Sequence, residues 1–270
     1  LDFWGKNWQA TESAMAQVRA EQEDLQNTLL QLTTAVADSY LQTRTYDSEL
    51  DILTRTLGTR QHSYDLNKDQ FNAGLINELA VEQAKSDLES VAAEIQNTSK
   101  LRSMAENRLA ELTGQPASTF FLEPEKTLPA LPNIAPGVPS SMLQRRPDIR
   151  QALALIESAQ LNVGVAKTGY FPDFTLTLDY GFISSKANKL FNWKSHVWLA
   201  AIDAVTPLYT AGRISAQIDD AMSQYKQAVA SYLDTVLVAF QQVEDSLYSI
   251  DATKKQLMHL QLLVEAADKA

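Results

Sequence analysis

Apolar residues recur at helical spacing through most of this chain, and the recurrence predicts several long helices. From about Asn7 to Asn72 there is no proline, and the only glycine is Gly58. Apolar positions three or four residues apart are typical of one helix face. Here they are Leu25, Leu29, Leu32, Val36, Leu50, Leu53 and Leu57. One helix of this length spans roughly 100 Å, at about 1.5 Å per residue, which favours a coiled coil or a helical barrel over an ordinary globular domain.

A chain reversal is predicted after this first helix. Gly74 is placed to take the left-handed conformation that ends a helix. Asn77 can cap the helix that follows, which is expected to run to about Thr113, with Gly114 as its stop. We therefore expect a long antiparallel helical hairpin over residues 6–113, with its tip near 72–77.

A break in composition follows the helical hairpin. Seven of the nine prolines lie between Gly114 and Pro147, so we expect residues 114–146 to be a connection without long regular structure. Pro147 suits the first position of a new helix, and Asp148 is favourable near its positive end. This helix is predicted over residues 147–169.

The clearest strand pattern lies between this helix and the last one. Large apolar residues alternate there with polar or small ones, namely Phe174, Leu176, Leu178, Tyr180 and Phe182. A second extended run, from about His196 to Thr206, completes a predicted β-hairpin over 170–208. Gly212-Arg213 then opens a long helix over 211–270.

The alternation has two interpretations. It is typical of a half-buried strand in a soluble sheet, and equally of a membrane-barrel strand that faces lipid on one side. A two-stranded hairpin is marginal alone, and a membrane requires a closed barrel. The membrane interpretation therefore requires a barrel that several chains close together.

One helical unit occurs twice in the chain. A shift of 207 residues aligns 11 identities in the 53 pairs from 5/212 to 57/264, among them Gly5 with Gly212 and Leu50 with Leu257. Ordinary composition gives roughly one match in fifteen by chance. Two amphipathic helices that merely share a composition are the alternative. Because each copy follows an extended segment, we expect two homologous halves.

Composition excludes several classes of function. The net charge of -10 disfavours nucleic acid, whose phosphates require clustered Lys and Arg. There is no cysteine, and the three histidines (His62, His196 and His259) lack metal-site spacing. Phosphate loops, dinucleotide fingerprints and nucleophile elbows are also missing from the sequence. We therefore expect no cofactor, no metal site, no catalytic residue and no enzymatic activity.

A family resemblance rests on three stretches. They are Leu143–Ala152, which contains Arg-Arg-Pro-Asp-Ile, then Ala159–Ala166 and Phe171–Leu176. They closely resemble the outer-membrane factor family, the TolC-type efflux channels, above all the branch paired with resistance-nodulation-division pumps. Leu153 departs from the family, which usually has Glu there. Leu1–Gly5 looks like the end of a barrel strand, and with no first strand pair and no second helical hairpin, the chain is expected to be a central fragment.

The resemblance implies a mainly α fold: long antiparallel helical hairpins from an α-barrel, with a short antiparallel β-hairpin. It implies a homotrimer when complete, with transmembrane β-strands in the outer membrane of a Gram-negative bacterium and coiled-coil helices in the periplasm. A periplasmic adaptor (membrane fusion) protein and an inner-membrane efflux pump would dock on it. Its expected function is passive transport of multidrug or toxic compounds, and hence antibiotic resistance. The alternative is a periplasmic adaptor or another coiled-coil interaction protein.

Three groups of residues are candidate sites. Ala73, Gly74 and Leu75 form the hairpin tip, which is either a turn with a hydrophobic plug or a docking point for the adaptor. Flanking acidic residues either favour cations at the tip of a pore or are ordinary solvated surface: Asp65, Asp69, Glu78 and Glu82. The family motif is expected to fix a helix start and the belt around the tube: Arg145, Arg146, Pro147 and Asp148.

Overall fold

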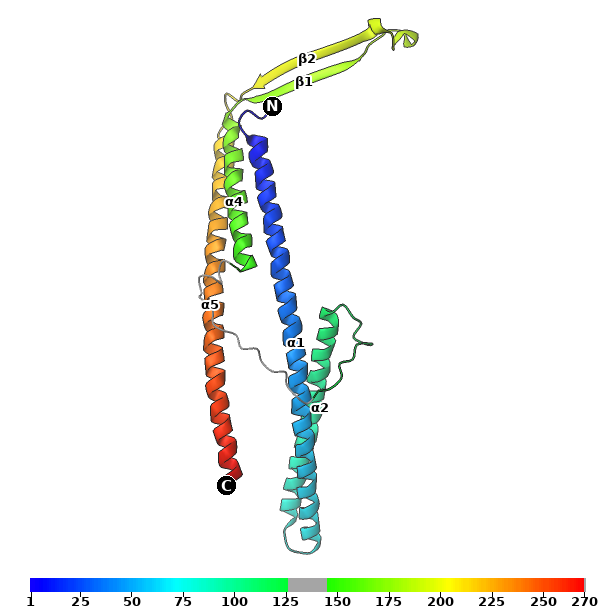
Figure 1. The fold of residues 1–270 in the computed structure, drawn as a ribbon, viewed down its shortest axis with the longest axis vertical. Helices are drawn as coiled ribbons and strands as arrows, with labels where there is room; N and C mark the ends of the chain where they lie inside the picture. Colours follow the sequence, from blue (N-terminus) through cyan, green and yellow to red (C-terminus); the bar gives the residue numbers. More distant parts are fainter. Residues whose placement is uncertain (126–144, 270) are drawn as a thin grey trace. The chain divides into compact units, whose positions relative to one another are not determined.

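The computed structural model describes residues 1–125 and 145–269. Figure 1 shows its main elements, which are α1 (Lys6–Asn72), α2 (Glu78–Leu112), α4 (Pro147–Lys167), β1 (Asp173–Phe182), β2 (His196–Val205) and α5 (Arg213–Lys269). Two compact units divide the chain: one holds Leu1–Asn27 with Pro136–Ala270, the other Thr28–Ala135. The mainly α fold with one short antiparallel β-hairpin is confirmed. Residues 126–144 of the expected Pro-rich connection lie outside the described part.

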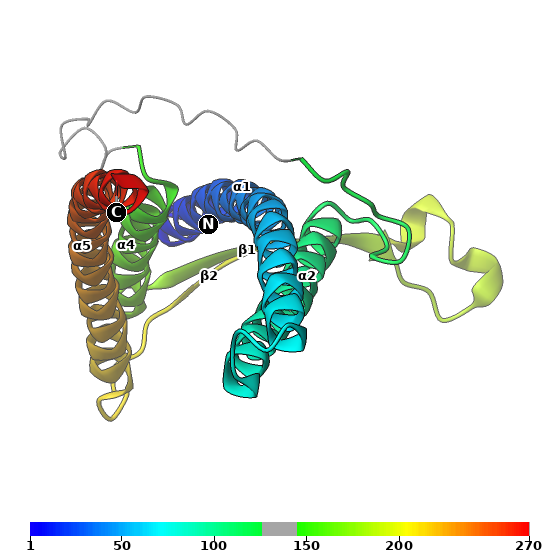
Figure 2. The same cartoon turned by 90° about the horizontal axis from the view of Figure 1, so that it is seen from below.

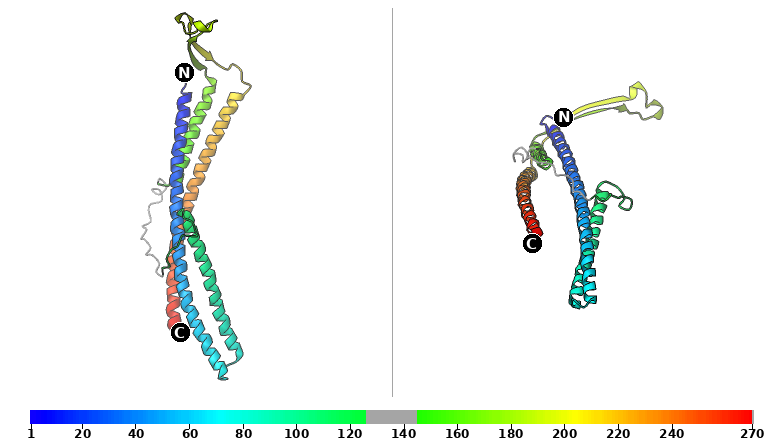
Figure 3. Two further views of the ribbon diagram at one scale, coloured as in Figure 1. Left: turned by 90° about the vertical axis from the view of Figure 1, so that its right-hand side faces the viewer. Right: turned by 60° about the horizontal axis from the view of Figure 1, so that its bottom comes forward.

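The Thr28–Ala135 unit is a helical hairpin. Its part of α1 runs antiparallel to α2 (Figure 3), as the sequence predicted. Glycines end both legs in the left-handed conformation, since φ is +75° at Gly74 and +70° at Gly114. Asn77 caps α2, because its side chain accepts a hydrogen bond from the Ala80 N–H at 3.2 Å. The reversal therefore follows from the local chemistry of a few residues.

Buried charges hold this unit together. The Asp47 side chain is 2% exposed. Its two oxygens accept from Arg102 Nε at 2.6 Å and from Arg44 Nη1 at 3.0 Å. The same carboxylate accepts from the backbone N–H of Glu125 at 3.1 Å. One carboxylate on α1 thus joins its own helix, α2 and the segment that follows α2.

A second carboxylate extends this network. Glu106 Oε2 accepts from Arg102 Nη1 at 2.8 Å, and Glu106 Oε1 accepts from the Leu122 N–H at 2.6 Å. Arg102 also donates to the Leu122 carbonyl oxygen at 2.8 Å, and Arg44 to that of Glu123 at 2.6 Å. We call Arg44, Asp47, Arg102 and Glu106 the clamp, because they fix the irregular residues 122–125 against the two helices.

Arg44 of the clamp keeps its charge despite burial. Burial disfavours the charged form of Arg44, but its contacts with Tyr40 and Asp47 outweigh this and raise the pKa of Arg44. The Arg44 guanidinium also lies over the Tyr40 ring, 5.0 Å from the ring centroid. A buried charge with all its partners is tolerated, whereas one that loses a partner is strongly destabilising.

The other unit packs three helices. Figure 2 shows α4 between α5 and the start of α1. The contact between α1 and α4 is lined by small residues, of which Ala16, Ala20 and Ala154 are buried. Inside this contact, Ser13 Oγ lies 2.9 Å from Ser158 Oγ and donates to Asn162 Oδ1 at 2.9 Å. Small side chains let the helix backbones approach closely.

Residues 1–5 differ from expectation. They form a turn and a bend, not the end of a strand. The Leu1 nitrogen donates to the Phe174 carbonyl oxygen at 2.6 Å, but the next contacts are made by side chains. Trp4 Nε1 donates to the Pro172 carbonyl oxygen at 2.8 Å, and the Trp4 ring stacks on Phe171. One main-chain bond and ring stacking anchor the segment beside β1 without forming a ladder.

The start of α4 is built as the sequence predicted. Pro147 occupies the first turn, and Asp148 is the acidic residue there. Arg146 donates to both Asp148 oxygens, from Nε at 3.0 Å and from Nη2 at 2.6 Å. These bonds lower the pKa of Asp148, although partial burial acts in the opposite direction. Arg146 Nη2 also reaches Gln242 Oε1 on α5 at 2.9 Å.

The twofold repeat has a local structural counterpart. Gly5 and Gly212, which the 207-residue shift aligns, both precede a long helix with positive φ, +69° and +82°. In each case the glycine carbonyl accepts the N–H four residues later, from Gln9 at 2.8 Å and from Ala216 at 3.0 Å. Both long helices therefore begin with the same step. Within the described residues, none of the helices is long and apolar enough to cross a membrane.

The clamp generates a stability prediction. Replacing Asp47 by Ala leaves two buried guanidinium groups without their shared acceptor, so we expect the free energy of unfolding to fall by about 3–5 kcal/mol. Chemical denaturation measures this loss. Asp251→Ala is the control, because it removes the exposed Asp251–Lys255 pair of α5 and should cost less than about 1 kcal/mol. Equal losses in the two variants would contradict the assigned role of the clamp.

The Arg146–Asp148 pair generates a pH prediction. Because the folded-state pKa of Asp148 is lowered, its stabilisation is fully present above the unfolded pKa of about 3.9 and disappears as pH falls through the folded pKa. Asp148→Asn should therefore cost about 1 kcal/mol at pH 7 and progressively less as the pH falls through the folded-state pKa of Asp148. Urea unfolding at several pH values measures the difference, with exposed Asp234→Asn as the control. A cost for Asp148→Asn that does not change with pH would rule out the ion pair as its source.

Candidate functional site

The helical hairpin tip is a tight, exposed turn. The Ala73, Gly74 and Leu75 N–H groups donate to the carbonyl oxygens of Asp69, Phe71 and Gln70, at 3.0, 2.8 and 2.9 Å. Its backbone groups are thus used internally, and what it offers to a partner is side-chain surface. Leu75 is 74% exposed. Within this single chain the Leu75 side chain is therefore uncovered.

The four acidic residues near the tip are all exposed. Asp65 and Asp69 lie four residues apart on α1, and Glu78 and Glu82 four apart on α2, so each pair shares one side of its own helix. Asp65 Oδ1 accepts from Gln61 Nε2 at 3.0 Å. The structure therefore places the four on one hairpin end, in two pairs.

The family motif is a structural joint. Pro147 and Asp148 start α4, and Arg146 connects this start to Gln242 of α5. Arg145 is exposed just before the helix. None of these side chains lines the hollow described below. These contacts fix the start of α4 and connect it to α5.

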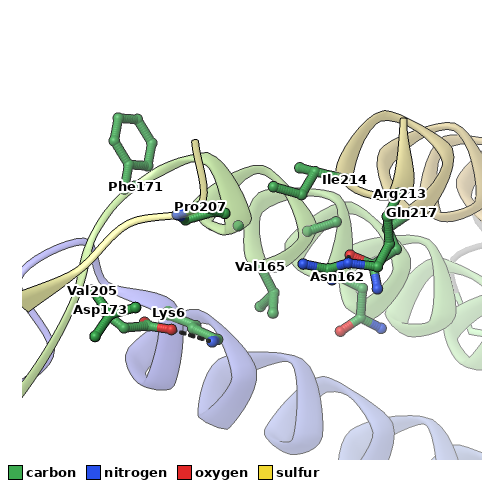
Figure 4. Close-up of a pocket in the computed structure, with 12 residues that line it drawn as sticks. Lys6, Asn162, Val165, Phe171, Asp173, Val205, Pro207, Arg213, Ile214 and Gln217 are labelled. Atoms are coloured by element: carbon green, nitrogen blue, oxygen red, sulfur yellow. Dashed lines mark hydrogen bonds and ion pairs between the residues drawn. The ribbon is translucent and has the colours of Figure 1, made fainter. Parts of the chain in front are cut away.

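A hollow of about 670 Å³ lies where the strands meet the helices. Figure 4 shows Lys6 of α1 paired with Asp173 of β1, at 3.8 Å, and Arg213 near Asn162 and Gln217. Lys6 and Arg213 are equivalent under the 207-residue shift, and each is the first residue of its helix. Two positive helix starts with two basic side chains make this hollow electropositive.

The hollow lacks the groups of a catalytic site. Asp173 is the only carboxylate among its lining residues, which include no serine, histidine or cysteine. Among the described residues there is also no group of three or more His, Cys, Asp or Glu side chains close enough to bind a metal ion. Through charge and packing, this arrangement can orient the β-hairpin relative to the first residues of α1 and α5.

Sequence reasoning missed the clamp and the polar contact inside the helix trio. Arg44 and Asp47 are three residues apart, and Arg102 and Glu106 four apart, so each pair had a helical ion-pair spacing. The contact between Asp47 and Arg102 depends on tertiary packing, and no local sequence pattern predicts it. No sequence pattern predicted the contact between Ser13 and Asn162 either, because serine and asparagine in helices usually face solvent.

Comparison with known proteins places the chain in a family. The profile of the family described as "Outer membrane efflux protein" matches residues 1–115 and 138–270. The chain is 29% identical over 267 residues to the probable efflux pump outer membrane protein TtgC of Pseudomonas putida, covering 98% of this chain and 55% of that protein. It is 30% identical to the outer membrane protein OprJ of Pseudomonas aeruginosa, covering 100% of this chain and 57% of OprJ. The chain thus spans little more than half the length of these relatives.

Solved structures share the fold. The outer membrane protein VceC of Vibrio cholerae matches with a TM-score of 0.92 at 26% identity, covering 100% of this chain and 64% of VceC. The outer-membrane channel OprN matches with a TM-score of 0.90 at 28% identity, covering 98% of this chain and 59% of OprN. Sequence profile and fold agree over nearly all of the chain, which belongs to the outer membrane efflux protein family.

Proposed function

We propose that this chain forms the central part of an outer-membrane channel through which an efflux system releases its compounds. The observation that carries the proposal is the exposed face of the β-hairpin that holds the alternating apolar residues of β1. Family membership and the helical hairpin support it, and the electropositive hollow explains how strands and helices are joined.

The strand register creates this face. Tyr180 lies opposite Trp198, and Leu176 opposite Ile202. Because paired residues project to the same side of a sheet, the alternating apolar residues of β1 share one face with their partners on β2. The members of this face are Phe174, Leu176, Leu178, Tyr180, Phe182, His196, Trp198, Ala200, Ile202 and Ala204.

The face is open within this chain. Leu178 is 70% exposed, Ile202 71% and Trp198 72%. Each strand has ten residues, which is the length that a tilted strand needs to span a bilayer. The opposite side carries Thr175, Thr177, Asp179 and Asp203 beside apolar residues. Such a hairpin fits a barrel wall, with lipid on one side and a mixed lumen on the other.

Closure of the barrel requires strands beyond β1 and β2. Two strands leave two unpaired edges, and lipid tolerates no open edge. We propose a homotrimer in which the hairpins contribute to one barrel and the long helices to one periplasmic α-barrel. Exposed leucines along α1, such as Leu25 and Leu30, would then contact neighbouring helices.

The channel is proposed to be a passive conduit and not an enzyme. Relatives are named for efflux of toluene, efflux of cations and export of pyoverdine, so one channel architecture serves unlike compounds. Selection is therefore assigned to an inner-membrane pump and a periplasmic adaptor. We propose that the adaptor docks at Ala73, Gly74 and Leu75, and that the acidic pairs beside the tip favour cations there.

The channel proposal predicts ionic conductance. The native protein that carries this chain should form trimers and conduct ions across a planar lipid bilayer. Conductance is expected because a barrel lumen with Asp179 and Asp203 is hydrated. Single-channel recording measures it, and size-exclusion chromatography with light scattering gives the oligomeric state. A monomeric protein that inserts but does not conduct would refute the proposal.

The tip proposal predicts a loss of efflux without a loss of conductance. Leu75→Asp places a charge at the apolar contact with the adaptor, so cells should accumulate the efflux dye ethidium as strongly as cells without the channel. Purified Leu75→Asp protein should conduct like the wild type. Met104→Asp, at an apolar residue of α2 that is 60% exposed and lies away from the tip, is the matched control. Wild-type efflux by Leu75→Asp, or an equal defect in Met104→Asp, would contradict docking at the tip.

A further inference from the structure

The loop that joins β1 to β2 has a charge opposite to that of the rest of the chain. Residues 183–195 contain Lys186, Lys189 and Lys194 and no acidic residue, in a chain whose net charge is -10. All three lysines are exposed. Among the described residues, no carboxylate lies within ion-pair distance of any of them. Their charge is therefore available to an external partner.

The loop has a defined conformation. Two short 3-10 turns, Ala187–Lys189 and Trp193–Ser195, occupy most of it. Ser195 Oγ donates to the Lys189 carbonyl oxygen at 2.8 Å, and Ser184 Oγ to that of Lys186 at 3.0 Å. The Lys194 N–H donates to Asn192 Oδ1 at 3.2 Å. These bonds fix the loop backbone at all three lysines.

Aromatic side chains lie where the loop joins the strands. Tyr180 and Trp198 are cross-strand partners, two residues from the strand ends, and are 66% and 72% exposed. In the loop itself, Phe191 packs edge-to-face on Phe182, and Trp193 stacks on His196. Exposed tyrosine and tryptophan prefer the boundary between the apolar interior of a membrane and its headgroups. In the sequence the three lysines lie between Tyr180 and Trp198, in the loop beyond the ends of both strands.

From this order of apolar face, aromatic pair and lysines, we infer that the β1–β2 loop binds phosphate groups of the glycolipid in the outer leaflet. The inference rests on the proposed function, which puts this face against lipid. Lysine ammonium groups bind phosphates as point charges, and the aromatic rings bring them to headgroup depth. The bound phosphates would fix how deeply the hairpin sits and stabilise the barrel rim.

The test compares two lipids that differ only in phosphate. Native mass spectrometry of the purified native protein in detergent measures binding of bisphosphorylated lipid A and of the same lipid after removal of both phosphates. The wild type should bind the phosphorylated lipid at least about tenfold more tightly, because each lysine near an anionic lipid surface contributes severalfold. Lys186→Gln/Lys189→Gln/Lys194→Gln should lose this preference.

A matched triple variant controls for net charge. Lys85→Gln/Lys100→Gln/Lys226→Gln removes three exposed helical lysines and should keep the wild-type preference. Conductance recorded on the same preparations separates the two proposals, since a channel that conducts but shows no phosphate preference overturns only the lipid inference. Equal loss in both triple variants, or an unchanged preference in the loop variant, also overturns it.

Discussion

A pair of helices has no interior, and this constraint shapes the whole structure. Where α1 meets α4, the buried residues are small, such as Ala16, Ala20, Ser13 and Ser158. Large apolar side chains lie elsewhere, and many leucines of α1 and α5 are exposed. Close approach of backbones and a few polar contacts therefore replace the layered core of a globular domain.

Polar contacts suit this arrangement because they are specific. Apolar stripes on long helices can slide by one turn at little cost, whereas a buried hydrogen bond or ion pair has one correct partner. Asp47 meets Arg102 only when α1 and α2 are in the observed register. In the same way, Ser13 meets Asn162 only when α1 and α4 are in the observed register. These contacts give each long helix a defined axial position that its leucines cannot provide.

The sequence predicted what depends on local chemistry. Gly74, Asn77, Gly114 and Pro147 have strong backbone preferences, so the helix ends were placed within a residue or two. The alternation from Phe174 to Phe182 predicted a strand, because side chains of a strand project alternately to its two faces. The clamp could not be foreseen, because Arg44 and Arg102 are brought to Asp47 by tertiary packing. The pairing of Tyr180 with Trp198 beside the β1–β2 loop could not be predicted either, because it depends on the strand register.

The two turns of the chain differ in a way that local folding does not require. Both the helical tip and the β1–β2 loop reverse the chain with internal hydrogen bonds, and neither turn needs charge to do so. Yet the tip is flanked by Asp65, Asp69, Glu78 and Glu82, while the loop carries three lysines and no acid. The acidic tip attracts cationic partners and repels anionic ones, and the basic loop does the reverse. Each turn therefore disfavours the surroundings that suit the other turn. In the proposed channel this asymmetry would orient the protein in the membrane, because phosphate-rich headgroups attract the basic loop and repel the acidic tip.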